Sequence, residues 1–238
     1  GLNMTKALML LLLVAIAPVS IARAGEADIQ ENLQKRIPQI GQIKQINKSP
    51  LPGLYEVVTQ DHLFYTDENA LFLIDGAMYD LKSMRNITDE RSRLLFAIDF
   101  NSLPLNFAVK KVKGKGARKL AIFTDPNCGF CKRLEQELLK IDNVTLYLFM
   151  YPMFPGSDEK VRGVWCSKNQ VKAWDDLMLN DSMPPAGTCK TPIDKVVALG
   201  RQLKVSGTPA LIFSDGTINP GYMPAAELEK ALSTAASR

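Results

Sequence analysis

The segment Cys128-Gly-Phe-Cys131 holds the residues of this sequence that are best suited to covalent chemistry. It follows an apolar run over residues 120–124, which predicts a buried strand, and it opens a helical pattern. The first thiol therefore lies at a helix N-terminus, where unpaired backbone N–H groups and the helix dipole favour an anion. The next two residues, Lys132 and Arg133, could add to this effect. A lowered pKa would make Cys128 the attacking thiolate, so the pattern predicts thiol–disulfide exchange with Cys131 as the resolving thiol.

Two other uses of this cysteine pair are disfavoured. A zinc site usually needs four ligands, but Cys166 and Cys189 lie far apart in the sequence and the only histidine is His62, which we interpret as a surface turn residue. A purely structural disulfide across so short a loop would stabilise the fold little. We therefore expect a redox pair, with no metal and no cofactor.

A second candidate element is the segment that ends in Thr208-Pro209, directly before an apolar run over residues 210–213. An X-Pro bond is usually trans, but a proline loop that faces a redox disulfide is typical of thioredoxin-like enzymes. A cis Pro209 would leave the backbone of Thr208 free to bind an extended substrate chain. Thr208 and Pro209 are thus the predicted substrate-binding residues.

The first 24 residues have the pattern of a secretory signal peptide. Lys6 precedes an apolar core over residues 7–17, and Ala22-Arg-Ala24 is a small-x-small cleavage site, so we expect cleavage after Ala24. Export to an oxidising compartment would keep a structural disulfide closed. Four cysteines allow three pairings, and if Cys128 pairs with Cys131, the other bridge is Cys166–Cys189.

The order of the predicted elements indicates an α+β chain with two domains. A helix over residues 26–37 and strands over 55–59, 63–66 and 70–74 predict a small antiparallel domain, residues 25–87. A unit of this size is marginally stable alone, which favours a role in dimerisation. A helical pattern over residues 87–100 predicts a connecting helix, and we place the linker helix between the two domains at residues 88–105.

Residues 106–238 alternate between strand and helix patterns and form the predicted catalytic domain. The expected elements are strands over 120–124, 144–150, 210–213 and 217–219, and helices over 131–140, from Ser157 as N-cap residue, around 193–200 and from Pro224. The formal net charge of +4 is too small to indicate nucleic-acid binding. We interpret the basic stretch over residues 110–115 as a solvated connection.

Several motifs together resemble the DsbC/DsbG family of periplasmic, thioredoxin-like thiol:disulfide isomerases. They are residues 123–131 (FTDPNCGFC), 164–166 (VWC), 207–210 (GTPA) and 220–222 (PGY), with 65–67 and 76–80 in the N-terminal part. The resemblance covers nearly all of the mature chain. The chain departs from the family at Phe130, where a tyrosine is usual, and we expect a modest effect on redox potential.

This resemblance implies a periplasmic V-shaped homodimer. Each chain would have a cystatin-like N-terminal dimerisation domain, a linker helix and a thioredoxin-like domain with a helical insertion. It also implies that Cys166–Cys189 is structural and that the inner-membrane reductant DsbD keeps Cys128 and Cys131 reduced.

Three functions are compatible with these features. The leading hypothesis is isomerisation of wrong disulfides in misfolded or misoxidised exported proteins, with an accompanying chaperone activity. A DsbG-like reduction of single oxidised cysteines is the second, and a binding chaperone without redox chemistry is the third. The Gly-Phe dipeptide between the cysteines favours the first over the second.

Overall fold

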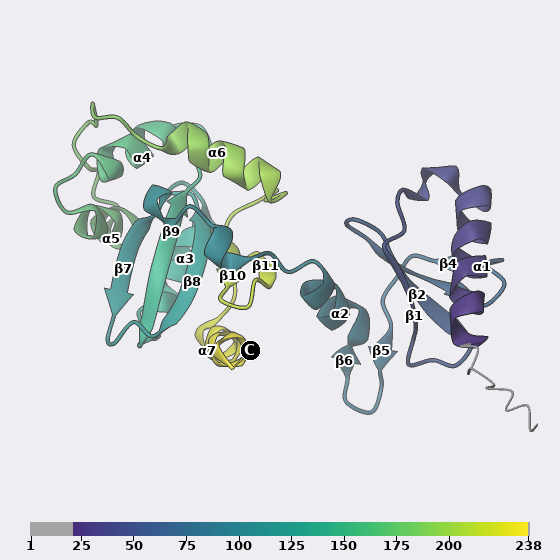
Figure 1. Cartoon of the computed structure of the whole chain (residues 1–238). Coiled ribbons are helices and arrows are strands. Elements are labelled where there is room, and N and C mark those ends of the chain that lie inside the picture. The colour runs from purple at the N-terminus through teal and green to yellow at the C-terminus, as the bar shows by residue number, and fades with distance from the viewer. Residues whose placement is uncertain (1–20, 238) are drawn as a thin grey trace, which may run out of the picture. The chain divides into compact units, whose positions relative to one another are not determined.

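The computed structural model describes residues 21–237, which form two compact units with mixed helices and sheets (Figure 1). One unit extends to Asp89 and the other begins at Glu90, so the division falls within helix α2, Ile87–Leu95. The predicted α+β class is confirmed. The predicted signal peptide lies outside the described residues, apart from the backbone of 21–24. Among the described residues, no helix has the length and apolar character needed to cross a bilayer.

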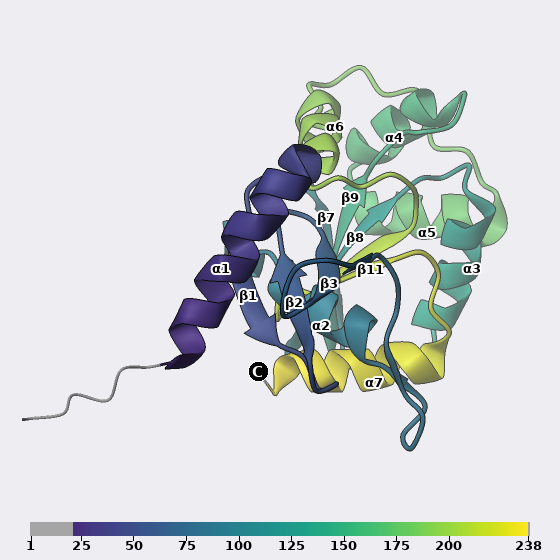
Figure 2. The ribbon, with the colours of Figure 1, turned by 90° about the vertical axis from the view of Figure 1, so that its right-hand side faces the viewer.

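The N-terminal unit is one helix on an antiparallel sheet with strand order β1-β2-β3-β4. Its elements are α1 (Ile21–Arg36), 3-10 helix η1 (Pro38–Ile40), β1 (Gln45–Lys48), β2 (Leu54–Val58), β3 (Leu63–Asp67) and β4 (Leu73–Ile74), followed by the hairpin strands β5 (Tyr79–Asp80) and β6 (Arg85–Asn86). Helix α1 packs against the sheet through Ile29 and Leu33, which are buried with Ile46 and Val57 (Figure 2). The helix begins five residues before the predicted start.

The predicted strand over residues 70–74 is mostly wrong, because only Leu73 and Ile74 pair with β3. The carboxylate of Asp67 accepts backbone N–H groups of Asn69, Leu71 and Phe72 at 2.7–3.1 Å. These bonds hold the chain in a turn until residue 72, so β4 is short. It lies at the edge of the sheet and its apolar side chains are exposed.

The C-terminal unit is a five-stranded sheet with strand order β11-β10-β8-β9-β7, in which only β8 and β9 are parallel. The strands are β7 (Val109–Lys113), β8 (Arg118–Thr124), β9 (Val144–Met150), β10 (Ala210–Phe213) and β11 (Ile218–Pro220). The helices are α3 (Gly129–Leu138), α4 (Ser157–Trp165), α5 (Gln170–Asn180), α6 (Ile193–Gln202) and α7 (Ala225–Ala236), with 3-10 helices η2 (Phe100–Ser102) and η3 (Leu105–Phe107).

Both faces of this sheet are covered. Leu120 and Ile122 of β8 are buried in a cluster with residues of α3, α5 and α7, whereas Ala121 and Phe123 are buried in a second cluster with α6 and η2. The alternation follows from the two-residue period of a strand. Strand β8 is therefore central and apolar on both sides, and its end is a rigid place from which to hold a reactive loop.

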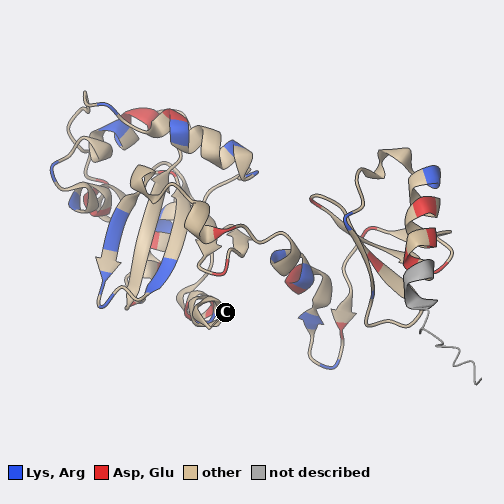
Figure 3. Ribbon diagram, in the orientation of Figure 1, with Lys and Arg blue, Asp and Glu red and all other residues tan. Residues whose placement is uncertain are grey.

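The basic stretch over residues 110–115 is not a solvated connection, and this prediction is wrong. Residues 109–113 form edge strand β7, paired with β9 (Figure 3). Lys111 forms a 2.6 Å ion pair with Asp175 of α5, and the Lys113 ammonium donates to the carbonyl of Leu138. Lysines on an edge strand are common because they discourage pairing with other chains. The density of lysines in this segment made it resemble a solvated loop, although it pairs with β9.

Helix α2 ends at Leu95, five residues before the predicted end of the helical pattern. The backbone N–H of Ile98 donates to the carbonyl of Gly216 at 3.0 Å, and the Asp99 carboxylate caps η2. Gly216 has φ +82°, and a Cβ there would lie 1.8 Å from the Ile98 carbonyl oxygen. This close approach requires glycine and takes the chain out of the helix.

Candidate active site

Two loops that are distant in sequence meet at one end of the central sheet. Strands β8 and β10 are antiparallel, with Ala210 opposite Phe123, so the loop after β8 and the loop before β10 emerge together. The Cys128 thiol donates to the carbonyl of Thr208 at 3.2 Å, and the Thr208–Pro209 peptide bond is cis. The structure thus brings together the four residues that were predicted for exchange and substrate binding.

Cys128 is the N-cap residue of α3. Its backbone N–H donates to the carbonyl of Asp125 at 3.1 Å, and its sulfur accepts the backbone N–H of Cys131 at 3.4 Å. An amide donor and the positive end of the helix dipole therefore both lie at this sulfur. Both cysteines are free thiols.

Cys131 has a different environment, although it is only one helical turn away. Its side chain is completely buried, and burial raises the pKa of its thiol to about 12. The backbone N–H of Asp125 and the hydroxyl of Thr124 oppose this rise only in part. Cys131 is accordingly protonated at neutral pH, which leaves Cys128 as the sulfur that can attack from the resting state.

Asp125 organises the loop before Cys128, and it was not among the site residues predicted from the sequence. Its fully buried carboxylate accepts four hydrogen bonds of 2.6–3.0 Å, from the backbone N–H groups of Asn127, Met153 and Phe154 and from the hydroxyl of Ser157. These bonds join the loop after β8 to the loop after β9 and to the start of α4. Its position directly after the buried strand β8 was the feature of the sequence that could have indicated this role.

Ser157 was predicted to cap α4, and this is wrong. The N-cap is Gly156, in the left-handed conformation with φ +79°, and Ser157 is the first helical residue. Its hydroxyl donates to Asp125 instead. The residue type indicated the start of the helix correctly. The hydrogen bond to Asp125, 32 residues earlier, could not be predicted from local sequence rules.

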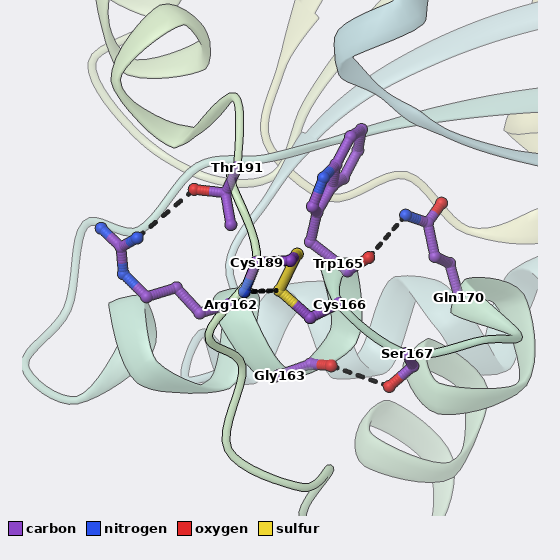
Figure 4. The surroundings of a disulfide bond; sticks show 8 residues. All are labelled: Arg162, Gly163, Trp165, Cys166, Ser167, Gln170, Cys189 and Thr191. Atoms are coloured by element: carbon purple, nitrogen blue, oxygen red, sulfur yellow. Dashed lines mark hydrogen bonds between the residues drawn. A yellow bond between two sulfur atoms is a disulfide. The ribbon is translucent and has the colours of Figure 1, made fainter.

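Cys166 and Cys189 form a disulfide in the helical region between β9 and β10 (Figure 4). Their Cα atoms are 5.6 Å apart, and the Cys189 backbone N–H donates to the Cys166 sulfur at 3.2 Å. The bridge anchors the irregular segment before α6 to the end of α4, near the hydrogen bond from Arg162 to Thr191. Closing a loop of this length stabilises the fold by about 3 kcal/mol in the chain-entropy model.

A buried carboxyl group lies on α3 one turn after Cys131. Glu135 is 3% exposed, and its Oε1 accepts the indole N–H of the fully buried Trp174 at 2.7 Å. Burial raises the pKa of Glu135, and this bond opposes the rise. Trp174 is thus a core residue, and its indole N–H is satisfied by Glu135 of α3. His62, by contrast, belongs to the N-terminal unit, where it stacks on Phe64.

Glu135 should make the stability of this unit depend on pH. A carboxyl whose folded pKa is raised destabilises the fold as pH increases from its ordinary pKa of 4.5 towards the folded value. In that window each pH unit costs up to about 1.4 kcal/mol. Urea unfolding of Glu135→Gln, followed by tryptophan fluorescence, should lack this loss, while the exposed control Glu227→Gln should retain it. Parallel pH profiles for wild type and Glu135→Gln would contradict this expectation.

Among the described residues there is no group of three or more His, Cys, Asp or Glu side chains placed to hold a metal ion. The chemistry that the site offers is that of its two free thiols. The Cys128 sulfur lies at the N-terminus of α3 and contacts the backbone carbonyl of Thr208. Cys131 is buried one turn further along the helix, and its thiol is protonated.

Comparisons with known proteins agree with this geometry. Residues 105–236 match the family described as thioredoxin-like domain, and residues 20–89 match the disulfide bond isomerase protein N-terminal domain. A crystal structure of a disulfide interchange protein from Neisseria gonorrhoeae superposes with a TM-score of 0.55 at 38% identity, covering 56% of this chain and 99% of that one.

Curated relatives carry the name DsbC. The probable thiol:disulfide interchange protein DsbC of Bordetella pertussis is 45% identical over 76% of this chain, which spans 65% of that relative's length. The thiol:disulfide interchange protein DsbC of Escherichia coli K12 is 32% identical, with 96% of both chains covered. The chain therefore belongs to the DsbC family of thiol:disulfide interchange proteins.

Proposed function

We propose that this protein is a periplasmic thiol:disulfide isomerase that rearranges wrong disulfides in exported proteins. The observation that carries the proposal is the Cys128 thiol, which caps α3 and faces the carbonyl before the cis proline, with Cys131 buried behind it. The names of the relatives support the same class of reaction.

The first step is attack by the Cys128 thiolate on one sulfur of a substrate disulfide. A bond forms between Cys128 and that sulfur, the substrate S–S bond breaks, and the other substrate sulfur leaves as a thiolate. The backbone of Thr208, beside Pro209, would hold the substrate chain in an extended conformation next to the attacking sulfur.

Two outcomes follow from the mixed disulfide. In isomerisation, the freed substrate thiolate attacks another substrate disulfide, and a later substrate thiolate displaces Cys128, so the substrate gains and loses no electrons overall. In the escape reaction, Cys131 attacks the Cys128 sulfur after losing its proton, which reduces the substrate and oxidises the enzyme. A reductant must then return two electrons, a role that we assign to DsbD.

Export would follow from the signal peptide predicted at residues 1–24, with cleavage after Ala24. The Cys166–Cys189 disulfide is compatible with an oxidising compartment, where such bridges persist. We assign this bridge a structural role, because Cys166 is the C-cap residue of α4 and its bond to Cys189 holds the irregular segment before α6.

Reactivation of a scrambled multi-disulfide protein tests the proposal. The mature chain, with Cys128 and Cys131 reduced beforehand, should restore native activity at substoichiometric amounts without an added redox buffer. If simple disulfides are reduced but the scrambled protein is not rescued, the isomerase assignment fails. Preferential reduction of a sulfenylated single cysteine would then favour the DsbG-like role.

A homodimer through the N-terminal unit completes the proposal. Strand β4 is the edge of its sheet, and Leu71, Phe72, Leu73 and Ile74 are 37–72% exposed there. An apolar sheet edge can pair with a second chain, and a small unit that buries little surface alone gains stability by doing so.

Charge placed on this edge should therefore give a monomer. We expect Phe72→Asp combined with Ile74→Asp to halve the solution mass of the mature protein, measured by light scattering, because two carboxylates would have to be desolvated at the interface. Leu139→Asp, which charges an equally exposed leucine of the C-terminal unit, should leave the mass unchanged. A double variant of unchanged mass would place the interface elsewhere.

A further inference from the structure

Arg133 lies against two aromatic rings beside the candidate active site. Its guanidinium carbon is 5.7 Å from the ring centre of Phe130 and 5.2 Å from that of Tyr222, and the two rings are 6.4 Å apart. Phe130 and Arg133 are three residues apart on α3, which places them on one face of the helix. These contacts fix a long, flexible side chain in one orientation.

This cluster borders both loops of the site. Phe130 stands between Cys128 and Cys131 and is 56% exposed. Tyr222 follows Gly221, whose backbone N–H donates to the carbonyl of Pro209 at 2.8 Å. A chain that binds along the proline loop with its disulfide at Cys128 would therefore pass next to Arg133.

The charge of Arg133 has no carboxylate partner among the described residues. The neighbouring cation, Lys132, is paired with Asp181, and the nearby Glu137 already accepts the backbone N–H of Ala225 and pairs with Lys140. The exposed guanidinium of Arg133 thus keeps its N–H donors available, since the rings contact it through their π systems.

We propose that Arg133 is a specificity-determining residue, which binds a carboxylate side chain of the substrate close to the disulfide under attack. A planar guanidinium binds a carboxylate through two parallel hydrogen bonds, and a group already held against two rings loses little freedom on binding. The inference rests on the proposed exchange reaction and adds a preference for acidic residues near the reacting disulfide.

A ratio of rates tests this preference. Two peptide disulfides would be compared that differ only in carrying Glu or Gln beside the cysteine, each mixed with the pre-reduced full-length mature protein. The initial rate of peptide thiol release is measured for each. Arg133→Gln is expected to lower the Glu-to-Gln rate ratio about 5-fold at low ionic strength, and added salt should lower the wild-type ratio. Intrinsic reactivity differences between the peptides cancel in this comparison.

Matched variants separate recognition from other effects. Lys132→Gln removes a neighbouring cation and should preserve the ratio, whereas Phe130→Leu combined with Tyr222→Leu should lower it by releasing Arg133. Arg133→Lys should restore only part of the ratio. If Arg133→Gln slows both peptides by one factor, the residue acts on Cys128 and the inference is overturned, as it is by an unchanged ratio. No reduction of either peptide by wild type would instead defeat the proposed exchange function.

Discussion

Cys128→Ser is expected to abolish reaction with disulfides, lowering the rate by about 10³-fold or more, whereas Cys131→Ser should still attack them. The difference follows from the environments of the two sulfurs. Burial raises the pKa of Cys131 to about 12, so this thiol stays protonated at neutral pH. Its side chain is also 0% exposed, against 4% for Cys128. Cys131 cannot replace Cys128 as the nucleophile.

We expect the two variants to differ also in whether a mixed disulfide with the substrate accumulates. With Cys131→Ser, the escape reaction is blocked, and a mixed disulfide between Cys128 and the substrate should accumulate in non-reducing electrophoresis or intact mass. With Cys128→Ser, no such adduct should form. An adduct on Cys131 in the Cys128→Ser variant would show that the buried thiol becomes accessible, and would reverse the assigned roles.

Much of this site was predictable because its chemistry is local in sequence. A strand pattern followed by two closely spaced thiols at a helix start fixes which sulfur caps the helix, and the structure has that arrangement at Cys128. The long-range step, from Cys128 to Thr208 across 80 residues, came from the family resemblance and from no local rule. Strand pairing of β8 with β10 supplies the physical connection.

The features that were predicted wrongly or missed share a physical cause. Partners that are distant in sequence decide whether a polar residue is solvated, caps a helix or packs in the fold. The lysines of β7 indicated a solvated segment, but Lys111 and Lys113 have partners on α5 and α3. Ser157 is a residue type that often caps helices, but its hydroxyl donates to the Asp125 carboxylate instead. The contact of Arg133 with both Phe130 and Tyr222 depends on the return of the chain after β11, which no periodicity reveals.

Asp125→Ala is expected to be the most destabilising single change near the site. The substitution would leave three part-buried backbone N–H groups and the buried Ser157 hydroxyl without their acceptor, and an unsatisfied buried donor costs about 1–3 kcal/mol before relaxation. We expect a net loss of about 4 kcal/mol, because water can reach part of the opened loop.

Trp165 and Trp174 make this loss measurable in the C-terminal unit alone. They are the only tryptophans of the chain and both lie in that unit, so urea unfolding followed by tryptophan fluorescence excludes the N-terminal unit. Asp158→Ala provides the control, because this exposed aspartate pairs with Arg162 on the surface of α4 and should cost less than about 1 kcal/mol. Equal losses for the two variants would show that the Asp125 bonds do not hold the loop. A large loss at Asp125 alone would mean that the stability of the C-terminal unit depends on the buried carboxylate three residues before Cys128.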